Sequence, residues 1–128
     1  MARKPSSTLT VGELRLMDVL WRVGAATIGT ITEALDDPPL AYNSVLTTMR
    51  ILEKKGYVRH KLLGRAFVYS PTVQREFAQR TAVSQMLSRF FNNSPRELML
   101  NVLESEEIDA DELARLRDLI ARKSEPEA

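Results

Sequence analysis

The hydrophobic pattern of the chain changes its period at Gly56, and this change limits the folds that the sequence can adopt. Apolar residues before it recur at helical spacing, and the last such segment covers residues 41–55. After it, residues 57–62 and 66–70 alternate as β-strands do, and Leu63-Gly64-Arg65 joins them. A glycine in so short a connection favours a hairpin. The sequence therefore predicts helices followed by a β-hairpin.

Two shorter helices are predicted before residue 41. Thr10 and Glu13 have the spacing of a capping box, which starts a helix, and Gly24 is placed to end it. Thr27 can cap a second helix, which Pro38 and the proline after it prevent from continuing. The order helix, helix, helix, hairpin over residues 8–71 is that of a winged helix-turn-helix, in which the second helix of the motif enters the major groove of DNA.

The predicted helix over residues 41–55 has two sorted faces. We expect the core-facing side to carry Tyr42, Val45, Met49 and Leu52. The opposite stripe has hydrogen-bonding and cationic groups and no carboxylate: Asn43, Thr47, Arg50 and Lys54. An ordinary solvent face is the alternative, but beside a basic hairpin this stripe indicates a DNA-reading surface.

Five polar residues on or next to this stripe have a predicted role in DNA binding. Asn43 and Thr47 can read base edges. Arg50 can read guanine or bind phosphate, and Lys54 is a phosphate partner. Ser44 can hold a phosphate through its hydroxyl and backbone amide.

For Leu46 the sequence leaves two interpretations open: packing on the second helix, or contact with a thymine methyl. The hairpin adds further predicted phosphate contacts, with solvation as the alternative: Arg59, Lys61 and Arg65. Trp21, Phe67 and Tyr69 are expected in the core.

The charge of the chain is divided unequally along its length. Residues 1–82 carry twelve basic and seven acidic side chains, whereas residues 83–128 carry six and ten. A basic part beside an acidic one indicates that one part meets a polyanion; a solvated surface of mixed charge is the alternative.

Residues 72–123 are predicted to form a helical dimerisation domain. Asn92-Asn93 ends a long helix, Ser94 begins another, and Asp109 opens the last. Because helices this short seldom form a stable core alone, we expect their apolar faces to meet a second copy, with packing on the first domain as the alternative. The residues expected at the dimer interface are Met86, Phe90, Phe91, Met99, Leu103 and Leu116. Residues 1–7 and 124–128 are expected to be flexible tails.

Several classes of function are not expected. The chain has no cysteine and a single histidine, so His60 is given no ligand role, and neither a metal nor a cofactor is predicted. No nucleophile elbow, phosphate-binding glycine loop or HExxH motif is present, so an enzyme is not predicted. No apolar run is long enough for membrane insertion, and the cytoplasm is the expected location. A protein-interaction module built on a winged helix is the alternative to a DNA-binding repressor.

Four sequence segments together resemble the penicillinase-repressor (BlaI/MecI/CopY) family of winged-helix transcriptional repressors, over about residues 9–122. The segments are Glu13-Leu14 leading to Leu20-Trp21, Val45-Leu46-Thr47 leading to Leu52-Glu53-Lys54-Lys55-Gly56, Gly64-Arg65 leading to Pro71, and Met99-Leu100-Asn101-Val102-Leu103-Glu104. The resemblance implies a cytoplasmic homodimer that represses transcription by occupying a double-stranded DNA operator of dyad symmetry.

The resemblance also implies a mechanism of release, by proteolysis within the dimerisation region with a membrane sensor metalloprotease as partner. The bond that matches the cleaved Asn–Phe bond of the penicillinase repressors is Asn101–Val102. Copper sensing is not expected, because the cysteine cluster of the copper-responsive members is missing. Ala41 stands where the family tends to have Ser, so the recognition helix is expected to have no side-chain cap.

Overall fold

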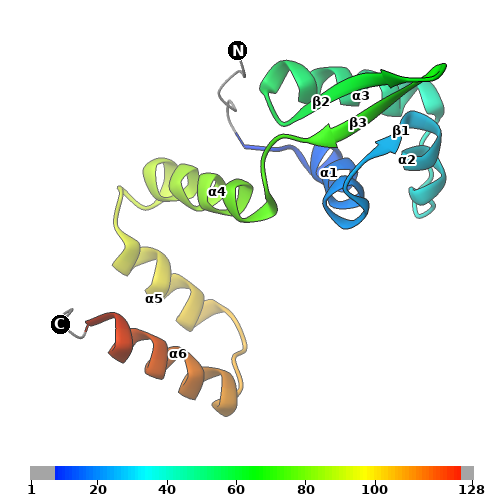
Figure 1. Ribbon diagram of the computed structural model, residues 1–128. Coiled ribbons are helices and arrows are strands. Elements are labelled where there is room, and N and C mark those ends of the chain that lie inside the picture. Colours follow the sequence, from blue (N-terminus) through cyan, green and yellow to red (C-terminus); the bar gives the residue numbers. More distant parts are fainter. Residues whose placement is uncertain (1–7, 125–128) are drawn as a thin grey trace. The chain divides into compact units, whose positions relative to one another are not determined.

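The computed structural model describes residues 8–124, and the outer parts of the two predicted tails, residues 1–7 and 125–128, lie outside this range. The helices and strands follow one another as α1 (Val11–Val23), β1 (Ala26–Thr27), α2 (Ile28–Ala34), α3 (Tyr42–Lys55), β2 (Val58–Leu63), β3 (Ala66–Pro71), α4 (Arg75–Phe90), α5 (Pro95–Ser105) and α6 (Ala110–Ser124) (Figure 1). The predicted winged helix-turn-helix is confirmed. Ser124, expected in a tail, is the last residue of α6.

The predicted start and end of α1 and the predicted end of α3 are confirmed by their caps. The Thr10 hydroxyl accepts a hydrogen bond from the Glu13 backbone amide at 3.1 Å, and Thr10 N donates to the Glu13 carboxylate at 2.8 Å. Gly24 closes α1 at φ +89° and Gly56 closes α3 at φ +92°, a region that glycine enters without steric cost. Ala41 precedes α3 without a side-chain cap, as expected.

The sheet has three antiparallel strands in the order β1-β3-β2. Gly64 and Arg65 form the two-residue turn of the hairpin, and Gly64 has φ +63°. In the register His60 lies opposite Tyr69, and Leu62 lies opposite Phe67. Strand β1 was not predicted; it pairs with the free edge of β3, and its last residue, Thr27, also caps α2.

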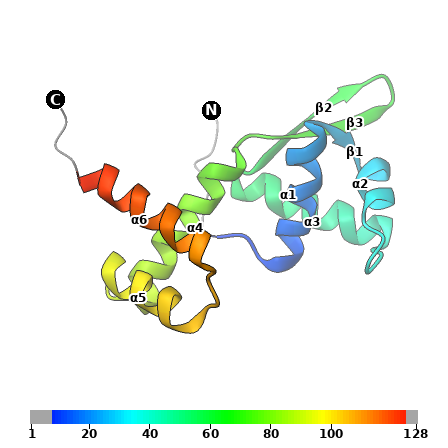
Figure 2. The same cartoon turned by 90° about the horizontal axis from the view of Figure 1, so that it is seen from below.

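The buried core of the described residues lies entirely between Leu16 and Tyr69. Helices α1, α2 and α3 pack against one another there (Figure 2), with β3 against α1 and α2. Two expectations about this core are wrong. Tyr42 is 52% exposed because it begins α3, ahead of the turns that pack on other elements. Phe67 is 53% exposed because it lies near the tip of the hairpin.

Trp21 and Tyr69 were also expected in the core. Tyr69 is buried, whereas Trp21 is half-buried and packs against the rim of the core. Its indole nitrogen donates a hydrogen bond to the backbone oxygen of Val73 over 2.9 Å. This bond satisfies the polar edge of a large, mostly apolar ring.

The described chain forms two compact units, which divide inside α4 between Met86 and Leu87. The starts predicted for α5 and α6 are confirmed, because Ser94 accepts a hydrogen bond from Glu97 N and Asp109 accepts one from Glu112 N. None of the described residues of α4, α5 or α6 is buried. Within residues 8–124, every helix is too short or too polar to cross a lipid bilayer.

Candidate nucleic-acid interface

The polar stripe predicted on α3 is exposed along the whole helix. Its four members stand on the face opposite the buried side chains of Val45, Met49 and Leu52, and they are Asn43, Thr47, Arg50 and Lys54. The single carboxylate of α3, Glu53, lies off the stripe. The helix therefore presents donors, acceptors and cations together on one surface.

The two neighbours of this stripe differ in their surroundings. Ser44 is exposed in the first turn of α3, and its backbone oxygen accepts a hydrogen bond from the Thr48 hydroxyl over 2.9 Å. Leu46 is half-buried and packs against the core. Leu46 also lines the groove described below, where its side chain is accessible to a ligand.

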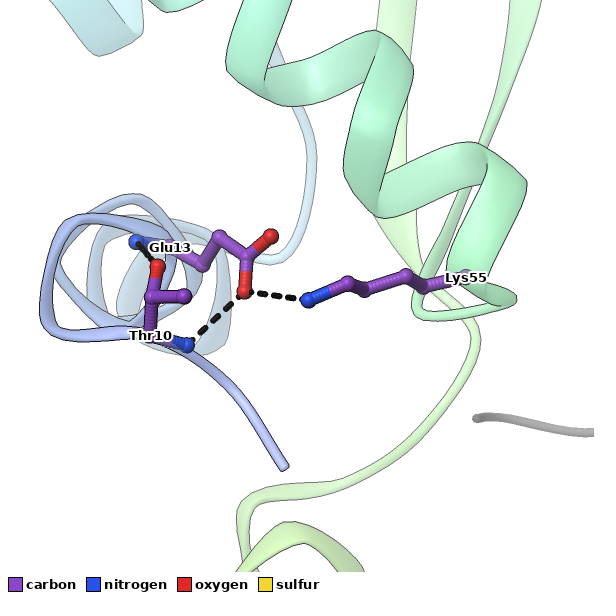
Figure 3. Close-up of polar contacts among 3 residues, drawn as sticks. All are labelled: Thr10, Glu13 and Lys55. Atoms are coloured by element: carbon purple, nitrogen blue, oxygen red, sulfur yellow. Dashed lines mark hydrogen bonds and ion pairs between the residues drawn. The ribbon is translucent and has the colours of Figure 1, made fainter. Parts of the chain in front are cut away.

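Lys55 anchors the C-terminal end of α3 to the start of α1 (Figure 3). Its Nζ atom lies 2.8 Å from Oε1 of Glu13, a side chain whose residue is only 5% exposed. Burial by itself raises the pKa of Glu13, but the Lys55 ammonium and the hydrogen bonds from Thr10 outweigh it, so the pKa lies below its usual value. The ion pair fixes α3 on the domain and occupies Lys55, which leaves Lys54 as the exposed lysine at this end.

A groove of about 450 Å³ lies between α3, the start of α2 and the hairpin. From α3 it is lined by Tyr42, Leu46 and Arg50, and from the hairpin by Arg65 and Phe67. Two guanidinium groups and two exposed aromatic rings therefore border one concave surface next to the polar stripe. Such a surface suits a polyanion that also offers flat or apolar groups.

The three cationic residues of the hairpin lie in two different places. Side chains on a strand alternate between its faces, so Arg59 and Lys61 share one face of β2, as predicted. His60, between them, reaches the α3 side, where it contacts Glu53. Arg59 and Lys61 therefore point away from α3, whereas Arg65 lines the groove with Arg50.

His60 is the residue of this region that sequence reasoning missed. Its Nδ1 atom lies 2.7 Å and 2.8 Å from the two carboxylate oxygens of Glu53. The strand alternation could have indicated that His60 faces the opposite way from Arg59 and Lys61. The identity of its partner depends on how the hairpin is placed against α3, which the pattern does not encode.

No cofactor or metal site stands out in the described part of the chain. Among residues 8–124, no three His, Cys, Asp or Glu side chains are grouped closely enough to hold a metal ion. No buried side-chain nitrogen or oxygen atom within the same range lacks a hydrogen-bond partner.

The residues predicted for a dimer interface are apolar and accessible on the C-terminal helices. Phe90 is 78% exposed, Phe91 is half-buried, and the others are exposed as well: Met86, Met99, Leu103 and Leu116. Asn101 and Val102, which form the candidate cleavage bond, are both exposed and lie in the middle of α5.

A family model described as "Penicillinase repressor" matches residues 9–122 of the chain. The penicillinase repressor of Bacillus licheniformis is 27% identical over 109 residues, which cover 84% of this chain and 85% of that protein. The methicillin resistance regulatory protein MecI of Staphylococcus aureus (strain N315) is 22% identical over 116 residues, 90% of this chain and 94% of MecI.

Solved structures of other proteins are similar in fold. The DNA-binding domain of the repressor BlaI, known from a solution structure, superposes with a TM-score of 0.51 at 26% identity, over 59% of this chain and 90% of that domain. A mutant MarR from E. coli, complexed with operator DNA, superposes with a TM-score of 0.50 over 91% of this chain and 76% of MarR. At 14% identity, the likeness to MarR concerns the fold alone.

Proposed function

The chain belongs to the penicillinase repressor family, a family of DNA-binding transcriptional repressors and not of enzymes, and we propose that it acts by occupying an operator of dyad symmetry as a homodimer. The observation that carries this proposal is the exposed, carboxylate-free stripe of α3 beside a groove that holds Arg50 and Arg65. A surface of this kind can read base edges and neutralise phosphates at the same time.

The residues of α3 divide into base readers and phosphate partners. Asn43 and Thr47 read base edges, Arg50 reads guanine or binds phosphate, and Ser44 and Lys54 bind phosphate. Leu46 lines the groove with a half-buried side chain, so it touches a thymine methyl only with its exposed edge.

The wing supplies further phosphate contacts from two directions. Arg65 acts together with Arg50 across the groove. Arg59 and Lys61 act as a pair on the outer face of the hairpin, where they reach a stretch of backbone beyond the one that α3 follows.

Residues 8–71 form the DNA-binding domain, and residues 72–123 dimerise through the apolar faces of α4, α5 and α6. The support for dimerisation is the accessibility of these faces, since the described residues of the three helices include no buried side chain. Helices with apolar faces and no core of their own gain stability when a partner covers them. Two linked recognition helices then bind half-sites about one turn of DNA apart.

Release from the operator follows from cleavage at Asn101–Val102, with a membrane sensor metalloprotease as the partner that starts it. Both residues are exposed, which supports access. Because the bond lies inside α5, cleavage requires local opening of that helix. The cut separates Leu103 and α6 from the rest of the interface. The repressor binds its operator in the cytoplasm, and there it also meets the cytoplasmic side of the membrane metalloprotease.

The experiment that tests this function is selection of bound duplexes from a random DNA library by the full-length protein, followed by sedimentation of the free protein and the complex. We expect inverted repeats with a spacing of about one helical turn, and two chains per duplex. Affinity should fall steeply with salt concentration. If no DNA sequence is enriched from the library, or if the affinity for DNA does not change with salt concentration, a protein-interaction module is favoured instead.

A further inference from the structure

The single histidine of the chain joins the wing to the recognition helix. His60 lies in β2, and its Nδ1 atom approaches both carboxylate oxygens of Glu53 in α3, at 2.7 Å and 2.8 Å. The two side chains are each about one-third exposed. A donor shared between two carboxylate oxygens fixes the imidazole in direction as well as in distance.

Two aromatic rings of β3 also contact the imidazole. The ring of Phe67 stands perpendicular to that of His60 with 5.1 Å between centroids, and the ring of Tyr69 is tilted against it at 5.2 Å. The perpendicular contact with Phe67 is edge-to-face, an arrangement that stabilises a pair of rings beyond the effect of burying their surface. His60 therefore contacts β3 and α3 at once, and Phe67 and Tyr69 both belong to the lining of the groove.

Glu53 is the one acidic residue of α3, and its place on a DNA-binding helix is unfavourable. An uncompensated carboxylate at this point repels phosphate, because the two charges have the same sign. His60 covers Glu53 and gives it a hydrogen-bond donor. The contact thus has two effects: it positions the wing, and it reduces the repulsion between α3 and DNA.

We propose that His60 is a positioning residue for operator binding, which holds the hairpin against α3 through Glu53 and compensates the single carboxylate of the recognition helix. The inference rests on the proposed function, since it requires that α3 and the wing bind DNA. It makes the contact between wing and helix depend on the charge of the imidazole, because a charged donor binds a carboxylate more strongly than a neutral one does.

The groups around His60 determine the sign of this dependence. From α3 it faces Glu53, and from β3 the phenol of Tyr69. Burial, Glu53 and Tyr42 raise the pKa of Tyr69 and outweigh the guanidinium of Arg50, which lowers it, so the phenol stays neutral between pH 6 and pH 8. Arg59 and Lys61, its neighbours in β2, point to the opposite face. An imidazolium donates to a carboxylate more strongly than a neutral imidazole does, and it adds a positive charge next to the DNA. Operator affinity should therefore rise as the pH falls from 8 to 6.

The test measures the affinity of the full-length protein for its selected operator at pH 6, 7 and 8, at constant ionic strength, for the wild type, His60→Gln and His60→Leu. We expect the affinity of the wild type to rise about two- to fivefold between pH 8 and pH 6, the range of a partly exposed ion pair. His60→Gln keeps a donor for Glu53, so it should match the wild type at pH 8 but lose the gain at pH 6. His60→Leu should bind more weakly than both at pH 8.

The matched control is Lys61→Gln, a neighbouring substitution on the opposite face of the same strand. It should lower affinity by the same factor at every pH and keep the pH profile of the wild type. Thermal unfolding of each variant confirms that it is folded. A wild type that selects no DNA overturns the proposed function itself. A wild type that selects DNA, with a pH profile that His60→Gln leaves unchanged or with equal affinity of His60→Leu at pH 8, overturns this inference alone.

Discussion

Lys55, the last residue of α3, donates a hydrogen bond across 2.8 Å to Glu13, in the first turn of α1. The same carboxylate oxygen accepts a hydrogen bond from the backbone amide of Thr10. One oxygen atom therefore takes part in the N-terminal cap of α1 and also holds the C-terminal end of α3. Lysine at a helix C-terminus also interacts favourably with the helix dipole. The orientation of α3 therefore depends on Glu13, a residue that lies outside the proposed DNA-binding surface.

Replacement of Glu13 by Gln is the first prediction. The variant loses the charge that pairs with Lys55 and weakens the capping box, so the free energy of unfolding should drop by about 1–3 kcal/mol in urea denaturation. Glu33→Gln, an exposed change in α2, is the matched control and should leave stability within about 0.5 kcal/mol. Equal stability of the two variants would contradict a structural role for the ion pair.

The effect of Glu13 should depend on pH with a definite sign. Because the Lys55 ammonium and the hydrogen bonds from Thr10 hold the pKa of Glu13 below its usual value in the folded protein, the folded state favours the carboxylate form. Its contribution to stability is present above the unfolded pKa and is lost as the pH falls through the folded pKa. The stability difference between wild type and Glu13→Gln should thus be constant near neutrality and shrink below about pH 4. A difference that grows on acidification would reverse the assigned direction.

Ala41→Ser should stabilise the protein, which is the second prediction. Ala41 has the extended backbone of an N-cap, φ −71° and ψ 150°, but no side-chain oxygen for the free amides of α3. A serine hydroxyl supplies one, and such a cap contributes about 1 kcal/mol. Thr10→Ala, which removes an existing cap from α1, should cost a similar amount. Urea titrations of both variants measure the pair of opposite shifts.

The third prediction separates sequence specificity from affinity. Asn43→Ala and Thr47→Ala should narrow the gap between operator and random DNA by about 1–3 kcal/mol for each lost base contact. Lys54→Ala should weaken both DNAs alike, because a phosphate partner carries no sequence information. Competition gel shifts with both duplexes decide it. If Thr47→Ala weakens both equally, Thr47 is a phosphate contact.

The fourth prediction concerns the two faces of the wing. Arg65→Ala and the double variant Arg59→Ala/Lys61→Ala should each reduce the slope of log affinity against log salt concentration, by about 0.9 for every phosphate contact removed. Arg65 borders the groove with Arg50. In footprinting experiments, Arg65→Ala should therefore leave fewer bases protected next to the site that α3 contacts. A double variant with the salt slope of the wild type would place Arg59 and Lys61 outside the interface.

The fifth prediction concerns the C-terminal helices. Leu103→Asp and Met99→Asp each place a charge on an exposed apolar face of α5, and they should convert the dimer to a monomer in sedimentation. Loss of dimerisation should lower the affinity for a dyad operator by about 10²- to 10⁴-fold. Val23→Asp, an equally exposed change at the end of α1, is the control and should stay dimeric. A monomeric wild type would refute the dimer.

The parts of the fold that could be predicted from sequence are those encoded by neighbouring residues. Thr10 with Glu13, Gly24 and Gly56 mark helix ends within one or two turns of chain, and all three were placed correctly. Strand β1 was missed because Ala26 and Thr27 are too few to show an alternating pattern. Its position depends on the edge of β3, which lies about forty residues later.

In the candidate site, too, the features that neighbouring residues encode could be predicted, and the contacts between distant elements could not. The helical period sorts the two faces of α3, so the exposed stripe followed from spacing alone. The strand period puts Arg59 and Lys61 on one face but does not say which face meets α3, and Tyr42 and Phe67 fit an apolar pattern at positions where no element covers them. Contacts such as His60 with Glu53 arise only when helix and hairpin pack together.

The distribution of the core sets an order for the assembly of the protein during its synthesis. Within residues 8–124, the buried apolar side chains end at Tyr69, and every later helix is left with an uncovered face. Domains generally fold as units, the N-terminal one first, while the ribosome is still adding residues. The winged helix can therefore be complete before α5 and α6 leave the ribosome. In the dimer proposed above, each new chain would therefore complete its DNA-binding domain before it has the helices that pair with a second chain, and pairing would be the last step of its maturation.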